Sequence, residues 1–293
     1  MIKPFIKQTN SKTRAAIFMS GGGSNAEKIL TAVNSSLTIA VIVTDRPKTS
    51  RAYELGRIYD VDVVAVDIRE FYRDRGQNRV SIMTTEGRTI REEWTDEVRR
   101  RIADYSVVFG IFAGFVPLCN LTRDFPCLNV HPGDLTYELN GVRHLVGLHT
   151  VPIERAILRN LDYMRSSVIV AEPYDGKGEN MDAGHVLGIS PKVSIDLMGH
   201  TLEELKAVAT QRPKKRPVKG YRDVLESVAM HNQETLKAGG DWVVLPPVVQ
   251  AFADGRFALD EHDCLRFLKN DDWLSVATVE FDEVNENPQL LEN

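Results

Sequence analysis

Short apolar runs that alternate with helical segments are the feature that most constrains the fold of this 293-residue chain. Residues 15–19 form an apolar run that stops at Ser20-Gly21-Gly22-Gly23-Ser24-Asn25, and apolar residues then recur at helical spacing over 26–33. The pattern repeats with a strand over 38–43, a helix over 51–59 and a strand over 63–66. Strands that alternate with helices predict a parallel, doubly wound sheet.

Later segments extend this pattern. Residues 107–113 are continuously apolar, as expected for a parallel strand buried on both faces, and residues 127–131 form the next strand. Two more strands, over 167–171 and 185–193, predict an antiparallel extension. From Thr201 onward the chain is helical, with helices expected over 201–210, 222–237 and 247–254. The fold class is therefore α/β, with a doubly wound, mostly parallel Rossmann-like sheet, an antiparallel extension and a helical C-terminal segment.

We expect one α/β domain over residues 13–200, with 201–257 as its helical C-terminal part and 258–293 as an extension. Within residues 67–101, a charged stretch, a four-residue apolar spacing predicts a helix that packs one stripe inward. The basic segment 211–219 is expected to be a solvated loop, and the acidic residues 280–293 are expected to fray.

Composition excludes several classes of protein. Hydrophobic residues make up 43% and charged residues 26%, which is typical of a globular chain. A net charge of −5 argues against a nucleic-acid partner. The three cysteines are too few and scattered for a disulfide framework or a metal-binding pair. No apolar run is long enough to span a bilayer and residues 1–14 lack an apolar leader, so we expect no membrane association and a cytoplasmic location.

The glycine-rich turn is the first candidate site. Consecutive glycines let a ligand approach the backbone closely, and amides at a helix N-terminus favour an anion such as phosphate. The alternative is a tight turn between strand and helix with no ligand. The turn lacks the GxGxxG pattern, so dinucleotide binding is disfavoured.

A polar pair at a strand end is the second candidate. In Asn129-Val130-His131-Pro132-Gly133, residues i and i+2 point to the same side of the strand, so the Asn129 amide and the His131 imidazole should converge at its carboxyl end. Ligands of doubly wound sheets bind at that end. A structural cap is the alternative role for this histidine.

Several short segments, taken in order, resemble the glycinamide ribonucleotide transformylase family of folate-dependent formyltransferases. They are Ser20-Gly21-Gly22-Gly23-Ser24-Asn25, Ala113-Gly114-Phe115, Asn129-Val130-His131-Pro132, Gly147-Leu148-His149-Thr150, Met181-Asp182-Ala183-Gly184 and Ala251-Phe252-Ala253-Asp254-Gly255-Arg256. The resemblance extends in patches over about residues 15–257.

The resemblance implies roles for particular residues. Asn129 resembles the amide that donates to the formyl oxygen, His131 the imidazole beside it, and Asp182 the carboxylate that orients this imidazole and a water. The residues that resemble the folate pocket are Gly114, Phe115, Val116, Pro117, Leu118 and Met181. Those that resemble the amides holding the acceptor's phosphate are Gly22, Gly23, Ser24 and Asn25. Asp241, with Glu234 as the competing match, resembles the acidic residue facing the acceptor. The implied co-substrate is 10-formyltetrahydrofolate, no metal is implied, and a homodimer is left open.

The chemistry of such a set follows from the reaction. An amine that attacks a formyl carbon produces an oxyanion, which an amide donor and an imidazolium stabilise. A histidine beside a carboxylate can relay the amine's proton through water.

Two loops depart from the family pattern: residues 132–147 form a longer segment than usual, and Asp182 is followed by alanine instead of a second glycine. Arg143 and His144, in the longer loop, are candidates to meet a substrate anion, with a solvent-facing position as the alternative.

The leading prediction is formyl transfer from 10-formyltetrahydrofolate to a phosphorylated amine, glycinamide ribonucleotide being the family's usual acceptor. The alternatives are a relative that formylates another amine, such as an amino sugar, and a hydrolase that passes the formyl group to water. Transfer to methionyl-tRNA and a non-catalytic binding module are less well supported.

Overall fold

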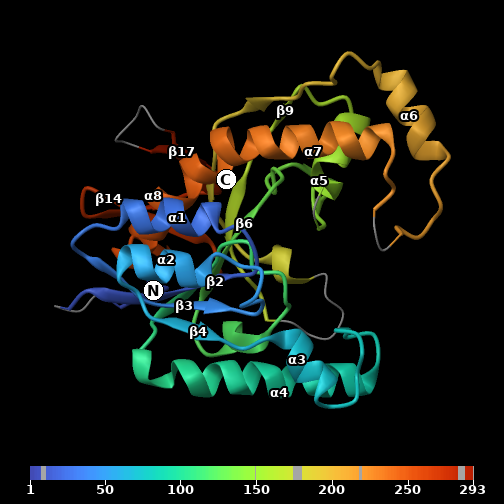
Figure 1. Cartoon of the computed structure of the whole chain (residues 1–293). Coiled ribbons are helices and arrows are strands. Elements are labelled where there is room, and N and C mark those ends of the chain that lie inside the picture. The colour runs from blue at the N-terminus through green and yellow to red at the C-terminus, as the bar shows by residue number, and fades with distance from the viewer. Residues whose placement is uncertain (8–10, 149, 174–179, 218–219, 283–287, 293) are drawn as a thin grey trace.

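The computed structural model describes residues 1–7, 11–148, 150–173, 180–217, 220–282 and 288–292 (Figure 1). Its main body is a nine-stranded sheet with helices on both faces. In spatial order the strands are β17 (Gln289–Leu291), β16 (Thr278–Glu280), β11 (Val186–Ile189), β10 (Ser167–Val170), β6 (Cys127–His131), β5 (Phe109–Phe112), β2 (Thr13–Met19), β3 (Leu37–Thr44) and β4 (Val63–Ala65).

Strand direction confirms the predicted fold class. The five strands from β6 to β4 are mutually parallel, whereas β10 pairs antiparallel with both β6 and β11. The helices are α1 (Ser24–Ala32), α2 (Ala52–Tyr59), α3 (Ile68–Arg73), α4 (Thr85–Ile102), α5 (Val151–Leu158), α6 (Leu202–Thr210), α7 (Val224–Leu236) and α8 (Trp242–Ala253). None of the described helices is long and apolar enough to cross a membrane.

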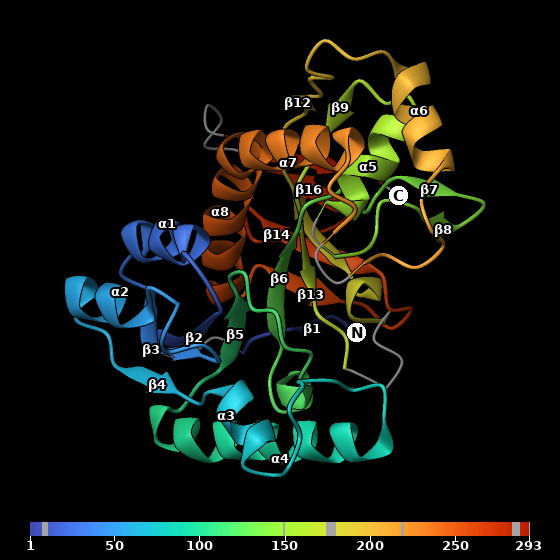
Figure 2. The same cartoon turned by 45° about the vertical axis from the view of Figure 1, so that its right-hand side comes forward.

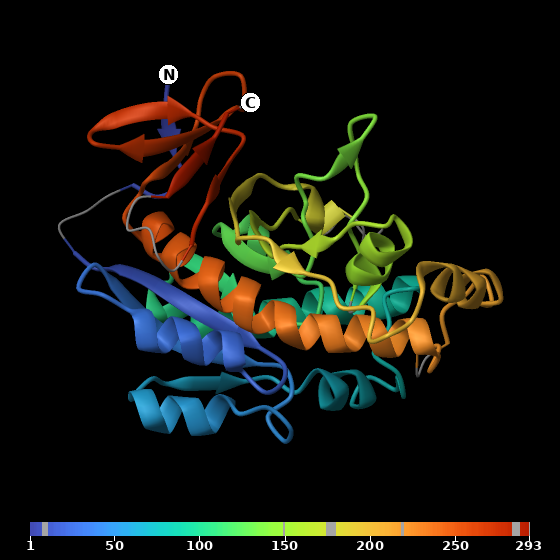
Figure 3. The same ribbon diagram turned by 90° about the horizontal axis from the view of Figure 1, so that it is seen from above.

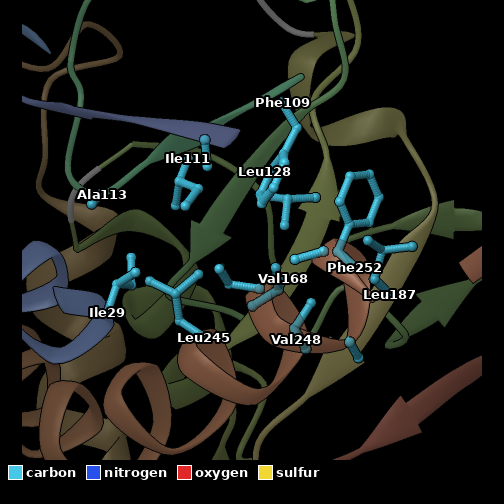
Figure 4. Packing of buried hydrophobic residues seen from close by; sticks show 14 of the residues in the cluster. Ile29, Phe109, Ile111, Ala113, Leu128, Val168, Leu187, Leu245, Val248 and Phe252 are labelled. Carbon is cyan, nitrogen blue, oxygen red and sulfur yellow. The ribbon is translucent and has the colours of Figure 1, made fainter. Parts of the chain in front are cut away.

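The two faces of the sheet carry separate cores, because successive side chains of a strand point to opposite sides. On β2, Ile17 and Met19 pack with α1, α2 and α8, and Figure 4 shows part of this cluster, including Ile29, Val248 and Phe252. Phe18 instead packs against α4 on the other face. The stripe predicted within residues 67–101 is confirmed, since Ile90, Trp94, Val98 and Ile102 of α4 are all buried.

Figure 2 shows α5, α6 and α7 away from the main sheet, and a third hydrophobic cluster joins these helices. It contains Ile153, Leu205, Leu225, Val228 and Leu236. The capping box of α6 is complete, because the Thr201 hydroxyl accepts from the Glu204 amide and the Glu204 carboxylate accepts from the Thr201 amide. This cluster places α5 and α7 beside the carboxyl end of β6.

Both termini lie at one end of the molecule (Figure 3). There β1 (Lys3–Pro4), β13 (Phe257–Leu259), β14 (Leu265–Lys269) and β15 (Asp272–Ser275) form an antiparallel sheet. Two ribbons complete the described strands, β7 (Glu138–Leu139) with β8 (Val142–Arg143) and β9 (Tyr163–Met164) with β12 (Val193–Ser194).

Three expectations about secondary structure were wrong. The strand predicted over 185–193 is two strands, because Pro191 lacks an amide proton and the chain leaves the sheet before β12. The described part of 280–293 does not fray, since β17 pairs with β16 and lengthens the central sheet. The helix predicted from residue 247 begins at Trp242 and continues from α7 through the π turn η4 (Lys237–Asp241).

Candidate functional site

A cavity of about 310 Å³ lies at the carboxyl ends of β5 and β6, facing the N-terminus of α1 and the junction of α7 with α8. Its volume lies within the range of small-molecule sites. Five groups of predicted residues line it: the pair on β6, the chain that follows β5, one residue of the glycine turn, Asp182 and Asp241.

Asn129 and His131 both line this cavity, as the strand periodicity predicts. His131 is 3% exposed, and its Nε2 lies 2.7 Å from the carbonyl oxygen of Leu145. Because a carbonyl only accepts hydrogen bonds, Nε2 must carry the proton that it donates. The ring nitrogen left to take part in chemistry is therefore Nδ1.

Asp182 lies on that side of the imidazole. Its Oδ2 is 3.6 Å from Nδ1 of His131, which is longer than a hydrogen bond but close enough for an ion pair when the ring is protonated. Asp182 belongs to the short 3₁₀ turn η3 (Asn180–Ala183) and also lines the cavity. Met181 lies in the same turn and its side chain is outside the described part of the structure, as is all of His149.

The five residues that follow β5 form one wall of the cavity. Gly114, Phe115, Val116, Pro117 and Leu118 all line it, and their assignment to a folate pocket stays a prediction. Two hydrogen bonds with Ser20, at the end of β2, hold this wall in place. The Ser20 amide donates to the Gly114 carbonyl at 3.2 Å, and the Ser20 hydroxyl accepts from the Val116 amide at 2.9 Å.

Arg91 fixes the far end of this wall. It is 5% exposed, and its Nη1 donates to the Leu118 carbonyl at 2.7 Å. Its guanidinium also lies over the rings of Tyr72 and Trp94. Sequence reasoning missed this residue, because nothing in a charged helix marks which arginine turns inward.

The glycine turn meets the cavity at one residue. Of the four residues predicted to hold a phosphate, Asn25 lines the cavity, whereas Gly22, Gly23 and Ser24 do not. Gly23 has a φ of 70°, and a Cβ there would lie 2.6 Å from Cε of Met19, so this position requires glycine. The N-cap position of α1 makes no side-chain hydrogen bond, so its first amides remain directed toward any anion that approaches.

Of the two residues predicted to face the acceptor, Asp241 lines the cavity and Glu234 does not. Oδ2 of Asp241 accepts from Nδ2 of Asn25 at 3.0 Å, and Oδ1 accepts from the Ser166 hydroxyl at 2.5 Å. Burial raises the pKa of Asp241, and these two hydrogen bonds oppose that rise. The Glu234 side chain is 72% exposed and pairs with Lys237.

The π turn η4 places Asp241 in the cavity. Within it, a Cβ on Gly240 would lie 2.6 Å from the Ser166 hydroxyl oxygen, so glycine lets the turn approach β10 closely enough for the hydrogen bond. Lys237, which begins this turn, lines the cavity as well. The signal in the sequence was the Gly239-Gly240 pair, although no pattern of apolar residues predicts a π turn.

The basic segment is only partly a solvated loop. Lys214 and Lys215 are exposed as predicted, but Arg216 is not. Its Nη2 donates to Glu226, and its Nη1 lies 3.6 Å from the buried Glu154. The solvent-facing prediction was wrong for Arg216 because α5 and α7 present buried carboxylates to this loop.

Arg143 turns inward rather than to solvent. Its Nη1 donates to the backbone carbonyls of Asp182 at 2.6 Å and of Gly184 at 2.9 Å. His144 accepts at Nδ1 from Nη2 of Arg159 at 2.7 Å. Within the described residues, no three His, Cys, Asp or Glu side chains gather where they could hold a metal ion.

The comparisons with known proteins bear on the fold. No protein-family model and no curated protein sequence matches the chain. Among solved structures, phosphoribosylglycinamide formyltransferase from Anaplasma phagocytophilum is similar at a TM-score of 0.57 and 16% identity, over 92% of this chain and 99% of that one. Glycinamide ribonucleotide transformylase 1 from Symbiobacterium toebii is similar at 0.54 and 18%, over 90% and 98%.

A formyltetrahydrofolate deformylase from Pseudomonas syringae pv. tomato is similar at a TM-score of 0.54 and 15% identity, over 86% of this chain and 65% of that one. The chain therefore has the fold shared by these formyltransferases and the deformylase. At these identities the likeness concerns the fold alone.

Proposed function

We propose that this protein transfers a formyl group from 10-formyltetrahydrofolate to the amine of a phosphorylated small molecule, for which glycinamide ribonucleotide is the first candidate. One observation carries the proposal: Asn129, His131 and Asp182 line the same 310 Å³ cavity as Asp241 and Asn25. A donor amide, an imidazole and a carboxylate thus lie beside a buried acidic group near a helix N-terminus. The family resemblance assigns the formylated folate to the wall formed by residues 114–118.

The reaction exchanges one carbon–nitrogen bond for another. The acceptor amine attacks the formyl carbon, the bond from that carbon to the folate nitrogen breaks, and the amine's proton ends on the folate nitrogen. In the intermediate, the amide of Asn129 and a protonated Nδ1 of His131 stabilise the oxyanion. Asp182 stabilises the imidazolium and, through water, accepts the amine's proton and returns it to the leaving nitrogen.

Acceptor recognition involves a different set of residues. Asp241 accepts hydrogen bonds from two neighbours, and a carboxylate has about four lone-pair positions, so it can also accept from an amine or amide of the acceptor. The first amides of α1, next to Asn25, suit the acceptor's phosphate. A cytoplasmic location and a homodimer remain predictions that accompany this function.

The hydrolase remains the alternative, because a deformylase shares this fold as well as the transformylases do. The test incubates the protein with 10-formyltetrahydrofolate, with and without glycinamide ribonucleotide or an amino sugar phosphate, and follows tetrahydrofolate, formate and formylated amine. We expect tetrahydrofolate only with an acceptor. Formate produced without acceptor would establish the hydrolase, and no turnover of the folate by folded protein would refute both.

Single substitutions test the catalytic assignment. We expect Asn129→Ala, His131→Ala and Asp182→Ala each to leave the protein folded and to reduce turnover by at least about 10². His231→Ala is the matched control, because His231 forms an exposed ion pair with Asp196, at 3.4 Å, away from the cavity. Near-normal rates in two of the three variants would indicate a binding protein instead.

Ligand-induced stabilisation checks the two halves of the site separately. A ligand that binds only the native state raises the melting temperature. We expect a shift with folates and a separate shift with the phosphorylated amine, the latter reduced in Asp241→Asn. If folates produce no shift in the parent protein, the assignment of residues 114–118 is wrong.

A further inference from the structure

The unusual loop between β6 and α5 contacts both members of the His131–Asp182 pair through two residues, Arg143 and Leu145. The Leu145 carbonyl accepts a hydrogen bond from Nε2 of His131 at 2.7 Å. Two residues earlier, Arg143 donates to the carbonyls of Asp182 and Gly184. The 3.6 Å between the imidazole and the carboxylate is therefore set by one segment, residues 143–145.

The turn that carries Asp182 needs such support. The last carbonyls of a helical turn have no partner within it, so a cation at this end is favourable. On its other side, a Cβ on Gly184 would lie 1.9 Å from the carbonyl oxygen of Val170, so the chain is pressed against β10. Between β10 and Arg143 the turn is held from two directions.

Arg143 is itself restrained in this position. It belongs to the β7–β8 ribbon, its side chain is 21% exposed, and its Nε lies 3.6 Å from Oε1 of Glu138 on the paired strand. An arginine can donate to two carbonyls from one nitrogen while a second nitrogen faces a carboxylate. This geometry explains why the extended loop bends back over the site.

A second cavity, of about 800 Å³, shows why the position of the turn matters. It is lined by Arg143 and Asp182 and shares Gly147, Leu148 and Asp182 with the catalytic cavity. Asp182 therefore lies between the two cavities. Since a misplacement of about 1 Å can reduce a rate by about 10², a turn in this place requires a rigid anchor.

We propose that Arg143 is a positioning residue, which holds the Asp182 turn at its working distance from His131. The assignment rests on the proposed formyl transfer. Arg143 acts through backbone carbonyls, so removing its side chain affects the reaction only by way of Asp182.

The experiment compares Arg143→Met, Arg143→Lys, Asp182→Asn and the double variant Arg143→Met with Asp182→Asn. Arg155→Met is the matched control. Arg155 also donates to two carbonyls of the same loop, those of His144 at 3.2 Å and Val146 at 2.7 Å, and neither hydrogen bond involves the Asp182 turn. Two quantities are measured: kcat/KM for formyl transfer, and hydrogen exchange of the amides of residues 180–190.

We expect Arg143→Met to lower kcat/KM by about 10² in the parent protein but by less than about threefold in Asp182→Asn. Arg143→Lys should restore part of the activity, because an ammonium also donates to carbonyls. Exchange over 180–190 should be at least about tenfold faster in Arg143→Met and unchanged in Arg155→Met.

Two results would overturn the proposal: unchanged exchange over 180–190 in Arg143→Met, or equal losses of activity with and without Asp182. The exchange measurement does not depend on turnover. If the parent protein transfers no formyl group, the proposed function fails, and exchange alone then shows whether Arg143 holds the turn.

Discussion

Gly133→Ala tests how rigidly the loop after β6 fixes His131. A Cβ at residue 133 would lie 2.4 Å from the carbonyl oxygen of Leu145, 2.9 Å from Cβ of Pro152 and 3.0 Å from Nε2 of His131. The first two contacts are with backbone and a proline ring, which cannot rotate away. To reach an ordinary contact of 3.4 Å, the Leu145 carbonyl must recede by about 1 Å, since 3.4 minus 2.4 is 1.0.

Such a displacement breaks the 2.7 Å hydrogen bond to His131. Overpacking of this kind typically destabilises by about 1–3 kcal/mol, and the lost hydrogen bond adds about 1 kcal/mol. We therefore expect the free energy of unfolding to fall by about 2–4 kcal/mol. Because Nε2 loses the acceptor that fixes the ring, kcat/KM should also fall by about 10².

Urea denaturation gives the first quantity, and steady-state formyl transfer under conditions where the variant is folded gives the second. Gly22→Ala is the matched control for stability, because a Cβ at that position meets no atom within 4 Å. Parent-like stability together with parent-like kcat/KM in Gly133→Ala would refute the reasoning, because the Leu145 carbonyl could then move without any loss of stability or activity.

Three further predictions follow from the same structure. Gly22→Ala should raise KM for the phosphorylated acceptor several-fold and leave stability unchanged. An unchanged KM would show that the acceptor's phosphate does not bind at the glycine turn. Burial raises the pKa of Asp241 above its ordinary value of 3.8, so the stability that this group contributes is full below pH 3.8 and is lost as the pH rises through the higher pKa of the folded state. Denaturation at a series of pH values should therefore show that the parent protein loses stability with rising pH relative to Asp241→Asn. Parallel stability profiles of the two proteins would contradict this. Glu154→Gln should lower the free energy of unfolding, measured by urea denaturation, by about 3 kcal/mol, because Glu154 is buried against Arg212 and Arg216. Glu234 is exposed, so Glu234→Gln should change that free energy by less than about 0.5 kcal/mol. Equally small effects of the two substitutions would mean that the buried carboxylate is not needed for stability.

The pair on β6 was predictable because a strand fixes side-chain direction. Asn129 and His131 are two residues apart on a strand whose carboxyl end meets the ligand edge of the sheet, and both line the cavity. Helical spacing likewise predicted the buried stripe of α4 that includes Trp94. In each case a repeating geometry translates sequence position directly into orientation.

Contacts made by loops were not predictable in this way. Arg143 donates to backbone carbonyls, and Leu145 acts through its own carbonyl. A sequence gives no indication of the direction in which a backbone carbonyl points. Arg216 looked like part of a solvated basic run because its partner Glu226 lies on α7, outside that run. Asp182 was reached by resemblance alone, since a short 3₁₀ turn has no periodic pattern.

The chemical step is more tightly constrained than the acceptor. Nε2 of His131 donates to the Leu145 carbonyl, so Nδ1 is the ring nitrogen beside Asp182, and the proposed reaction places the formyl oxygen within reach of Nδ1. Asp241, by contrast, already accepts from Ser166 and Asn25 and offers an acceptor only its remaining lone pairs. Several amines satisfy that condition, so the identity of the acceptor depends on measured turnover, whereas the proposed position of the reacting carbon rests on the direction of Nδ1.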